Sequence, residues 1–248
     1  MGAGAGAPEP RGPRTAAEAR AAFAAELEEL EGRALGGLEI VVEQIDRLVA
    51  ALRAGDRLLT LQVIDDDDRI DGRYLEVHQS LLSLLARQAP VAGDLRLVAA
   101  LLQVLGHMER MGDQCVNVAK LLPQPEDQPD PALMERLAEM CFRSAGLVDQ
   151  ARRAFADRDV GLAEALVTED DAVDTLNREC FRLALEVGED PLRREAAMHM
   201  MLAARCIERL ADNAVDIGEQ TAFVVSGLFR EFTDASRPGG APREAPTV

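Results

Sequence analysis

Four pairs of acidic residues in this chain have the spacing and the neighbours needed to form two clusters of carboxylates. The two members of each pair are four residues apart, so both side chains lie on one face of an α-helix. The pairs are Asp67 with Asp71, Glu109 with Asp113, Asp170 with Asp174, and Glu208 with Asp212. Grouped carboxylate oxygens are the ligands that Mg²⁺, Ca²⁺ and Mn²⁺ prefer, and iron also binds them. The pattern therefore indicates a metal-binding site.

The positions of the first two pairs predict that they meet across a helical hairpin. Asp71 lies 19 residues before Pro90, and Glu109 lies 19 residues after it. Asp67 and Asp113 lie 23 residues before and after the same proline. In an antiparallel hairpin that turns at this proline, residues equally far from the turn share a level. Four carboxylates then converge, and they repel one another unless a proton or a cation intervenes.

The second half of the chain repeats this arrangement. Asp174 and Glu208 are each 17 residues from Pro191, and Asp170 and Asp212 are each 21 residues from it. A hairpin that turns at this second proline would therefore bring another four carboxylates to matching levels.

One further oxygen donor follows each set, one helical turn along the chain. These donors are Asn117 in the first half and Asp216 in the second. They extend an all-oxygen ligand set, which disfavours structural zinc because that ion takes Cys or His ligands. Ferritin-like di-iron catalysis is also disfavoured, because it requires a Glu-x-x-His motif on inward helix faces. None of His78, His107 and His199 completes that motif.

Two other interpretations of the acidic pairs stay open. In so acidic a chain, an acidic pair at this spacing is ordinarily a solvated helix face, and most of the run 65–68 fits that description. The carboxylates could instead form an interhelical ion-pair network with Arg110 and Arg209, which follow the two key glutamates. Asp67 and Asp170 argue against full solvation. Apolar residues three or four positions away place both on a buried seam, where an unneutralised carboxylate is costly.

The elements that must hold these side chains are helices. Aromatic residues make up only 3% of the chain and tryptophan is absent, which favours helical bundles over sheet sandwiches. Asp56 and Asp159 are placed to cap helices, and Pro90 and Pro191 lie where a helix can begin but not continue. The sequence predicts six helices, at about 15–54, 57–88, 92–122, 131–157, 160–187 and 191–230.

The two halves of the chain are related by an internal repeat. A shift of 103 residues places Asp67 on Asp170, and a shift of 99 residues places the segment 108–117 on 207–216. We therefore predict an all-α fold of two tandem three-helix bundles. The expected divisions are a disordered tail at 1–14, a first bundle at 15–122, a Pro-rich linker at 123–130, a second bundle at 131–230 and a disordered tail at 231–248.

The overall composition narrows the class of protein. A net charge of −17 argues against a nucleic-acid partner, because nothing offsets the repulsion from phosphates. No apolar run reaches the length of a transmembrane helix, and the N-terminus lacks a secretory signal, so we expect a cytoplasmic protein that meets membranes only peripherally. The four cysteines lie far apart within apolar helical patterns, which predicts buried free thiols at Cys115, Cys141, Cys180 and Cys206.

Two segments of the repeat resemble the PhoU family of phosphate-uptake regulators: ERMGDQCVNVA at 109–119 and ERLADNAVDIG at 208–218. Supporting matches are DRID with the preceding Asp67, QAPVAGDLRLV at 88–98 and DDAVD at 170–174, and the resemblance covers about 16–230. It implies two three-helix bundles and metal binding through the acidic motifs. Carried over by position, the metal ligands are Asp67, Asp71, Glu109, Asp113, Asn117, Asp170, Asp174, Glu208, Asp212 and Asp216.

The resemblance also implies a function. It is that of a cytosolic protein, often a homodimer, that restrains a phosphate-specific ABC transporter and its associated sensor histidine kinase. In this role the protein is a negative regulator and an adaptor at the inner membrane face, contacting the transporter's cytosolic subunits, and not an enzyme. A carboxylate-bridged metalloenzyme and a purely structural helical scaffold are the alternatives.

The chain departs from the family pattern at four positions. Gln114 and Asn213 stand where the family often has His, directly after the Asp of each motif. In the second copy, Ala211 and Asp216 replace the usual Gly and Asn. The second site is therefore more anionic than the first, and the usual motif His has no counterpart at either position.

Overall fold

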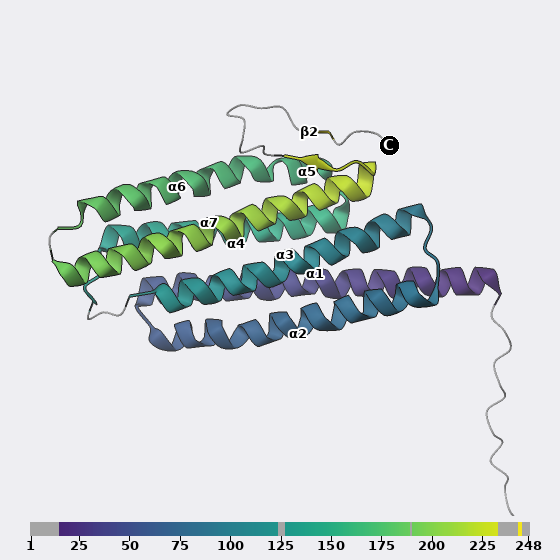
Figure 1. Ribbon diagram of the computed structural model, residues 1–248, viewed down its shortest axis with the longest axis horizontal. Helices are drawn as coiled ribbons and strands as arrows, with labels where there is room; N and C mark the ends of the chain where they lie inside the picture. Colours follow the sequence, from purple (N-terminus) through teal and green to yellow (C-terminus); the bar gives the residue numbers. More distant parts are fainter. Residues whose placement is uncertain (1–14, 124–126, 189, 233–242, 245–248) are drawn as a thin grey trace, which may run out of the picture.

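Long helices that run side by side form nearly the whole structure (Figure 1). The computed structural model describes residues 15–123, 127–188, 190–232 and 243–244. The elements are α1 (Ala16–Ala54), α2 (Arg57–Arg87), α3 (Ala92–Leu121), α4 (Pro131–Asp157), α5 (Val160–Glu164), α6 (Leu166–Glu186), α7 (Pro191–Ser226), β1 (Arg230–Glu231) and β2 (Arg243–Glu244). Helices α1–α3 form one bundle, and α4, α5 with α6, and α7 form the second. The predicted all-α fold of two three-helix bundles is confirmed.

Side-chain caps fix where several helices begin. The Asp56 carboxylate accepts a hydrogen bond from the Leu58 backbone N–H at 2.8 Å, and Asp159 accepts one from Leu162 at 2.9 Å. Both caps were expected from the sequence. Such caps satisfy backbone donors that have no partner within the helix. Pro191 occupies the first turn of α7, where its missing N–H costs nothing.

The helix predicted at 160–187 is wrong as a single element, because it breaks at Ala165 into α5 and α6. The side-chain amide of Gln150, on α4, donates a 3.0 Å hydrogen bond to the backbone carbonyl of Leu162. An uninterrupted helix would use that carbonyl to accept from the N–H four residues later. The contact from α4 therefore supplies a partner for the carbonyl at the break.

The C-terminal helix is shorter than predicted, and the chain beyond it is not all irregular. Helix α7 ends at Ser226 instead of 230, because Gly227 takes a left-handed conformation (φ 75°) that favours glycine. Strand β1 pairs with β2 in antiparallel register. Arg230 of β1 is the last residue of the predicted helix, whereas Glu231 and both residues of β2 lie in the segment 231–248 that was predicted as a disordered tail. The other predicted tail, at 1–14, lies outside the described residues, as do 124–126 of the linker.

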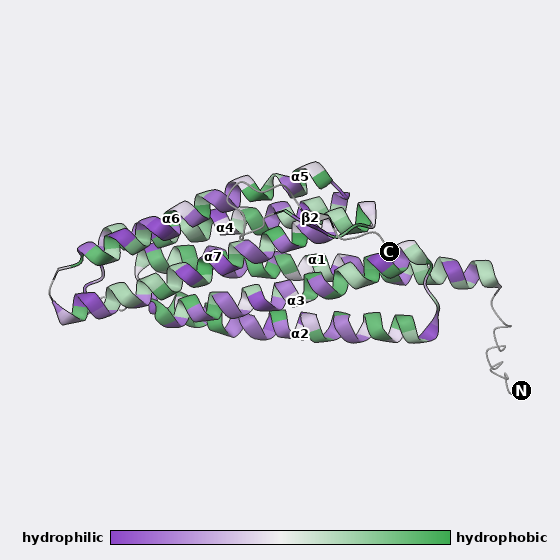
Figure 2. Cartoon of the chain, turned by 45° about the horizontal axis from the view of Figure 1, so that its top comes forward, coloured by the Kyte–Doolittle hydropathy of each residue, from purple (hydrophilic) through white to green (hydrophobic). Residues whose placement is uncertain are grey.

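The two bundles share one core. Buried apolar residues from all of the long helices form a single cluster, and the bundles join where α3 packs on α7 and α1 packs on α4. Hydrophilic and hydrophobic residues alternate along the helices, as the cartoon coloured by residue hydropathy shows (Figure 2). Cys115, Cys141 and Cys180 are buried free thiols and Cys206 is a partly buried one, so the predicted absence of disulfides holds for these four residues. Among the described residues, no helix combines the length and apolar character needed to span a membrane.

A glycine on α7 lets this helix pack tightly against the α5–α6 segment. A Cβ atom at Gly218 would lie 2.7 Å from Leu166 Cδ1 and 3.2 Å from the backbone oxygen of Ala163. We expect Gly218→Ala to lower the free energy of unfolding by about 1–3 kcal/mol, because the backbone oxygen cannot move aside cheaply. Thermal unfolding measures this.

The matched control is Gly36→Ala on α1, where a Cβ would meet nothing within 4 Å. There alanine should raise stability by up to about 1 kcal/mol through its better helix propensity. A Gly218→Ala protein that melted with or above the parent would contradict the close approach of α7 to Leu166.

Candidate functional site

The α2–α3 hairpin brings together the first acidic cluster, defined as Asp67, Asp71, Glu109 and Asp113. Burial raises the pKa of Asp67 to about 6, and repulsion from Asp71, Asp113 and Glu109 adds to that rise. The pKa of Glu109 is raised by burial and then by Asp113 and Asp71. These mutual effects place the four side chains within electrostatic reach of one another, as their equal distances from Pro90 predict.

Close packing at one glycine sets the spacing of this hairpin. A Cβ atom at Gly112 would lie 2.8 Å from the Asp67 Oδ1 atom and 3.1 Å from Ile70 Cδ1. The Gly of the ERMGD motif therefore lets α2 approach α3 and carries the Asp67 carboxylate onto the seam. Asp71 and Asp113 are exposed, so the cluster opens to solvent on one side.

The α6–α7 hairpin forms the second acidic cluster, defined as Asp170, Asp174, Glu208 and Asp212. Burial raises the pKa of Asp170 to about 7, helped by repulsion from Asp212, Asp174 and Glu208. The pKa values of Glu208 and Asp212 are also raised, in both cases chiefly by burial. Glu208 is only 8% exposed, so this cluster lies deeper than the first.

Two oxygen atoms of the second cluster lack a partner that their burial requires. Asp170 Oδ1 and Glu208 Oε2 are shielded from solvent and accept no hydrogen bond from the protein. A buried, unpaired carboxylate oxygen is costly unless a proton or cation neutralises it. The donors are all oxygen, which fits a hard cation such as Mg²⁺, Mn²⁺ or Ca²⁺, or carboxylate-bound iron.

The arrangement as it stands is not a finished coordination sphere. Within the described residues, no group of three or more His, Cys, Asp or Glu side chains is placed so that it could hold a metal ion. Like charges at short range repel one another, and the side-chain torsions of Asp and Glu can rotate. Ion binding in either cluster would therefore require side chains to rotate inward, and the metal site remains a prediction.

Arginine contacts differ from the predicted network. Arg205 forms an ion pair with Glu208, and Arg178 forms one with Asp174 at 3.6 Å. The expected partners Arg110 and Arg209 form no ion pair with the acidic clusters among the described residues, although both act at longer range on nearby carboxylates. The signal for the true partners was present, since each lies three or four residues from its carboxylate on the same helix.

The four carboxylates of the first cluster have no such partner. None of Asp67, Asp71, Glu109 and Asp113 forms an ion pair with any residue in the described part of the chain. The neighbouring residue Asp66, by contrast, does form ion pairs. It is buried, and it pairs with Arg47 and, at 3.1 Å, with Arg69. The expectation that most of the run 65–68 is a solvated helix face therefore does not hold for Asp66.

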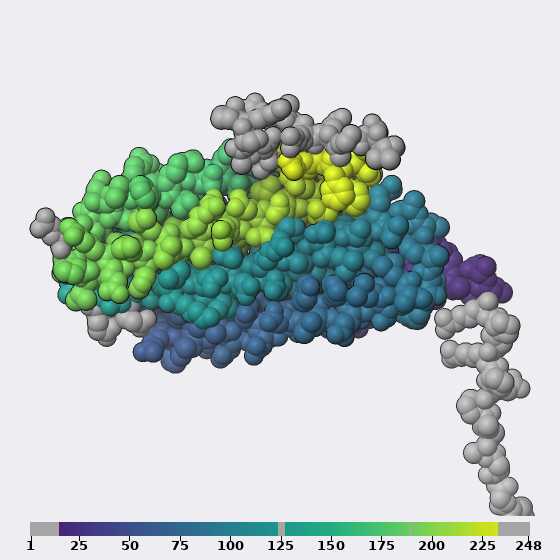
Figure 3. Space-filling view, viewed as in Figure 1, coloured from purple at the N-terminus to yellow at the C-terminus, as the bar shows by residue number. Residues whose placement is uncertain are grey.

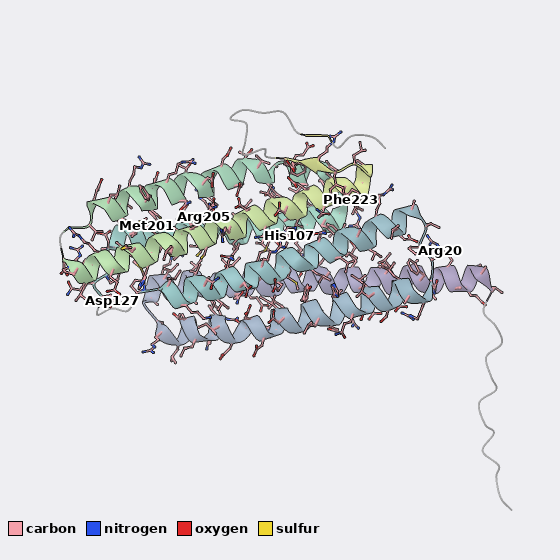
Figure 4. The ribbon with its side chains drawn as sticks, viewed as in Figure 1. Arg20, His107, Asp127, Met201, Arg205 and Phe223 are labelled. Atoms are coloured by element: carbon pink, nitrogen blue, oxygen red, sulfur yellow. The ribbon has the colours of Figure 1, made fainter. Side chains whose placement is uncertain are left out.

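The two predicted outer ligands are placed differently. Asn117 is exposed on α3. Asp216 faces the other bundle, where its Oδ2 atom lies 3.4 Å from His107 Nδ1. The same ring nitrogen lies 2.8 Å from Asn213 Oδ1, so His107 links α3 to α7 across the bundle interface (Figure 4). Sequence reasoning had given His107 no specific role, because the pairing depends on how the two bundles pack.

Comparison with known proteins places this geometry in context. The PhoU domain model matches residues 37–122 and again 137–221, once in each bundle. The phosphate-specific transport system accessory protein PhoU homolog 2 of Mycobacterium tuberculosis is 32% identical over 85% of this chain and 99% of its own. PhoU homolog 1 of Mycobacterium leprae is 32% identical over 89% of this chain and 99% of its own.

Solved structures agree with the arrangement of helices. The crystal structure of PhoU from Pseudomonas aeruginosa superposes with a TM-score of 0.75 and 29% identity, covering 83% of this chain and 99% of that one. The phosphate transport system regulatory protein PhoU from Streptococcus pneumoniae has the same fold, with a TM-score of 0.76 at 23% identity over 86% of this chain and 99% of that one.

The raised pKa of Asp170 predicts a pH-dependent stability of the metal-free protein. The folded state holds this proton up to about pH 7, whereas the unfolded chain releases it near the ordinary value of 3.8. Between these two pH values the folded state binds more protons than the unfolded chain. The free energy of unfolding is therefore higher at low pH and falls as the pH rises from 3.8 to about 7. In chelator at about pH 8, Asp170→Asn should gain about 1–2 kcal/mol of stability, a value reduced for solvent screening.

The neighbouring exposed residue supplies the control for this measurement. Asp171→Asn should gain much less, because Asp171 is exposed and raises the pKa of Asp170 less than Asp212, Asp174 or Glu208 does. At about pH 4, Asp170→Asn and the parent should unfold almost alike, because both carry a neutral side chain there. An equal gain at both pH values would rule out the charge of Asp170 as its source.

Proposed function

The chain belongs to the PhoU family, and we propose that it restrains phosphate uptake and phosphate-starvation signalling when phosphate is plentiful. The observation that carries the proposal is the doubled acidic hairpin, found in a chain that matches curated phosphate-transport accessory proteins along nearly their full length. The proposed action is binding, with no bond made or broken in a substrate.

The proposed partners are the cytosolic subunits of a phosphate-specific ABC transporter and a sensor histidine kinase. The names of the relatives, as accessory proteins of the phosphate-specific transport system, support the first partner. The kinase, the homodimer and the cytoplasmic location follow from the resemblance of the motifs alone. On this proposal the protein is an adaptor whose affinity for each partner depends on that partner's state.

Metal binding is the second part of the proposal. Asp67, Asp71, Glu109 and Asp113 would hold an ion in the first cluster, with the matching four residues in the second and Asn117 and Asp216 as outer donors. A bound cation would supply the positive charge that neutralises each cluster. The contribution of the chain to ion binding is to bring the carboxylates of two helices to the same level. The unpartnered oxygen atoms of Asp170 and Glu208 and the raised pKa values support this role.

The regulatory proposal is tested by deleting the gene in its native host. With phosphate plentiful, we expect higher phosphate uptake and expression of phosphate-starvation genes, because the restraint on transporter and kinase is gone. Uptake of radiolabelled phosphate and transcript levels measure the two effects. Complementation with the intact gene is the control, and a deletion strain with unchanged uptake and unchanged expression would refute the proposal.

The metal proposal predicts a loss of bound ion without a loss of fold. Asp113→Ala and Asp212→Ala should each lower metal content by roughly half, while helicity persists because apolar packing holds the bundles. Elemental analysis of protein purified without chelator or affinity metal measures the content, and circular dichroism measures the helicity. Asp68→Ala and Asp171→Ala, at exposed acidic positions beside the clusters, are the controls.

Native protein that carried no metal, and whose melting temperature did not change in chelator, would favour a purely structural scaffold instead. Turnover of a substrate that vanished in Glu109→Ala and Glu208→Ala, with the fold intact, would favour a carboxylate-bridged metalloenzyme.

A further inference from the structure

Helices α6 and α7 border an apolar groove of about 470 Å³ on the second bundle. Its apolar lining includes Phe181, Met198, Met201 and Leu202, and its charged lining consists of Arg178 and Arg205. We call this feature the α6–α7 groove. Phe181 is 50% exposed, Met198 65% and Leu202 56%, which are high values for large apolar side chains. The space-filling view shows α7 uncovered between α6 and α3 on this face (Figure 3).

The charge of the α6–α7 groove distinguishes it from the rest of the surface. Among the described residues that line it there is no Asp or Glu, although the chain carries a net charge of −17. The hollows beside α4 are lined by several acidic residues each. An adjoining hollow shares Leu202 and Arg205 with the groove and adds Lys120 and Arg209, also without an acidic residue among its described lining. This stretch of α7 is thus a basic and apolar surface on an acidic protein.

The two arginines of the groove belong to the second acidic cluster as well. Arg205 pairs with Glu208 and Arg178 pairs with Asp174, while more than half of each arginine side chain stays exposed. Each guanidinium therefore lies between a carboxylate of the cluster on one side and the groove on the other. Arg205 and Met201 occupy neighbouring turns of α7 beside α6 (Figure 4).

The first bundle lacks this connection. The repeat shift of 103 residues places Leu75 at the position of Arg178, and the shift of 99 residues places Gly106 at the position of Arg205. The carboxylates of the first cluster correspondingly form no ion pair within the described part of the chain. In the second cluster, by contrast, Arg178 and Arg205 join two of the carboxylates to the groove.

We propose that the α6–α7 groove binds an acidic amphipathic helix of a partner protein, and that Arg178 and Arg205 couple this binding to the occupation of the second acidic cluster by a cation. The coupling rests on the metal binding proposed above. The binding of a helix in the groove does not rest on metal binding, because the lining and the charge of the groove are properties of the chain alone.

Charge and shape select this occupant. An amphipathic helix would place its apolar face against Phe181, Met198 and Leu202, and flanking Glu or Asp would meet the two arginines. The flexible thioethers of Met198 and Met201 adapt to different apolar side chains. A second copy of this chain that paired through this groove would set Arg178 and Arg205 against the same two arginines, so it fits the groove less well.

Competition for the same charges produces the coupling. A cation in the second cluster competes with both guanidinium groups for Asp174 and Glu208, and so leaves them available to the groove. Acidic residues of a bound helix draw the same guanidinium groups away from the cluster, which favours the cation. Because linkage is reciprocal, each ligand should strengthen the other by the same factor, about five- to twentyfold.

The test uses the full chain, Mn²⁺ and two fluorescent probe peptides of about 20 residues. Both peptides carry a Leu stripe at helical spacing; Glu flanks the stripe in one and Lys in the other. Fluorescence anisotropy with and without Mn²⁺ measures peptide binding, and titration calorimetry measures Mn²⁺ binding. Mn²⁺ titrated into each peptide alone is the blank. We expect the Glu peptide to bind, more tightly with Mn²⁺, and the Lys peptide to bind weakly at all Mn²⁺ concentrations.

Three variants identify the residues responsible. The double variant Arg178→Ala, Arg205→Ala should weaken binding of the Glu peptide about tenfold or more and abolish its dependence on Mn²⁺, while Mn²⁺ still binds. Leu202→Asp should abolish peptide binding and leave Mn²⁺ binding to the clusters intact. Arg182→Ala, on α6 but outside the groove lining, is the matched control and should behave like the parent.

Several outcomes would overturn the proposal. Equal binding of the Glu and Lys peptides would remove the charge argument, and self-association of the chain that Leu202→Asp abolished would assign the groove to a second copy. Unchanged peptide affinity when Mn²⁺ fills the second cluster would remove the coupling. If Mn²⁺ does not bind at all, the metal part of the proposed function fails together with the coupling, whereas the peptide measurements still decide the groove.

Discussion

Repulsion between carboxylates at the seams of two helical hairpins is the constraint around which this structure is built. Each hairpin places four acidic side chains at matching levels, and burial raises the pKa of Asp67 in the first cluster and of Asp170 in the second. Repulsion within these clusters opposes folding at neutral pH, and the apolar residues above and below them on the same helices supply most of the energy that holds the helices together. The shared core of both bundles supplies it.

Most of the fold could be predicted because local chemistry and periodicity agree. Asp56 and Asp159 cap helices where the sequence indicated, and Pro191 begins one. The failures arise where a distant residue intervenes. The break at Ala165 accompanies a hydrogen bond from Gln150 on another helix, and no periodicity within 160–187 could indicate it. The early end of α7 had a local signal, the glycine at 227, which the apolar pattern beyond it concealed.

In the candidate site, too, one part could be predicted from the sequence and another could not. Equal distances from the two prolines were enough to bring the carboxylates together, because the rise of a helix per residue is fixed. Which arginine pairs with each carboxylate depends on the side-chain conformation. Arg178 and Arg205 form the ion pairs of the second cluster, and the arginines that follow the key glutamates form none with the clusters among the described residues. His107 escaped notice because its partners lie 106 and 109 residues away on the other bundle. The similar motifs at 109–119 and 208–218 therefore contact different residues, and the two halves of the chain are not interchangeable.

The shared core also bears on how a duplicated sequence is retained. Cutting the chain at the linker would bare the apolar faces along which α3 meets α7 and α1 meets α4. A lone half would have to cover that surface by pairing with a copy of itself. Such a pair would lack the contacts that His107 of the first half makes with Asn213 and Asp216 of the second. The two halves are therefore complementary to each other and not to themselves, so a substitution where they meet in either half bears on the stability of both.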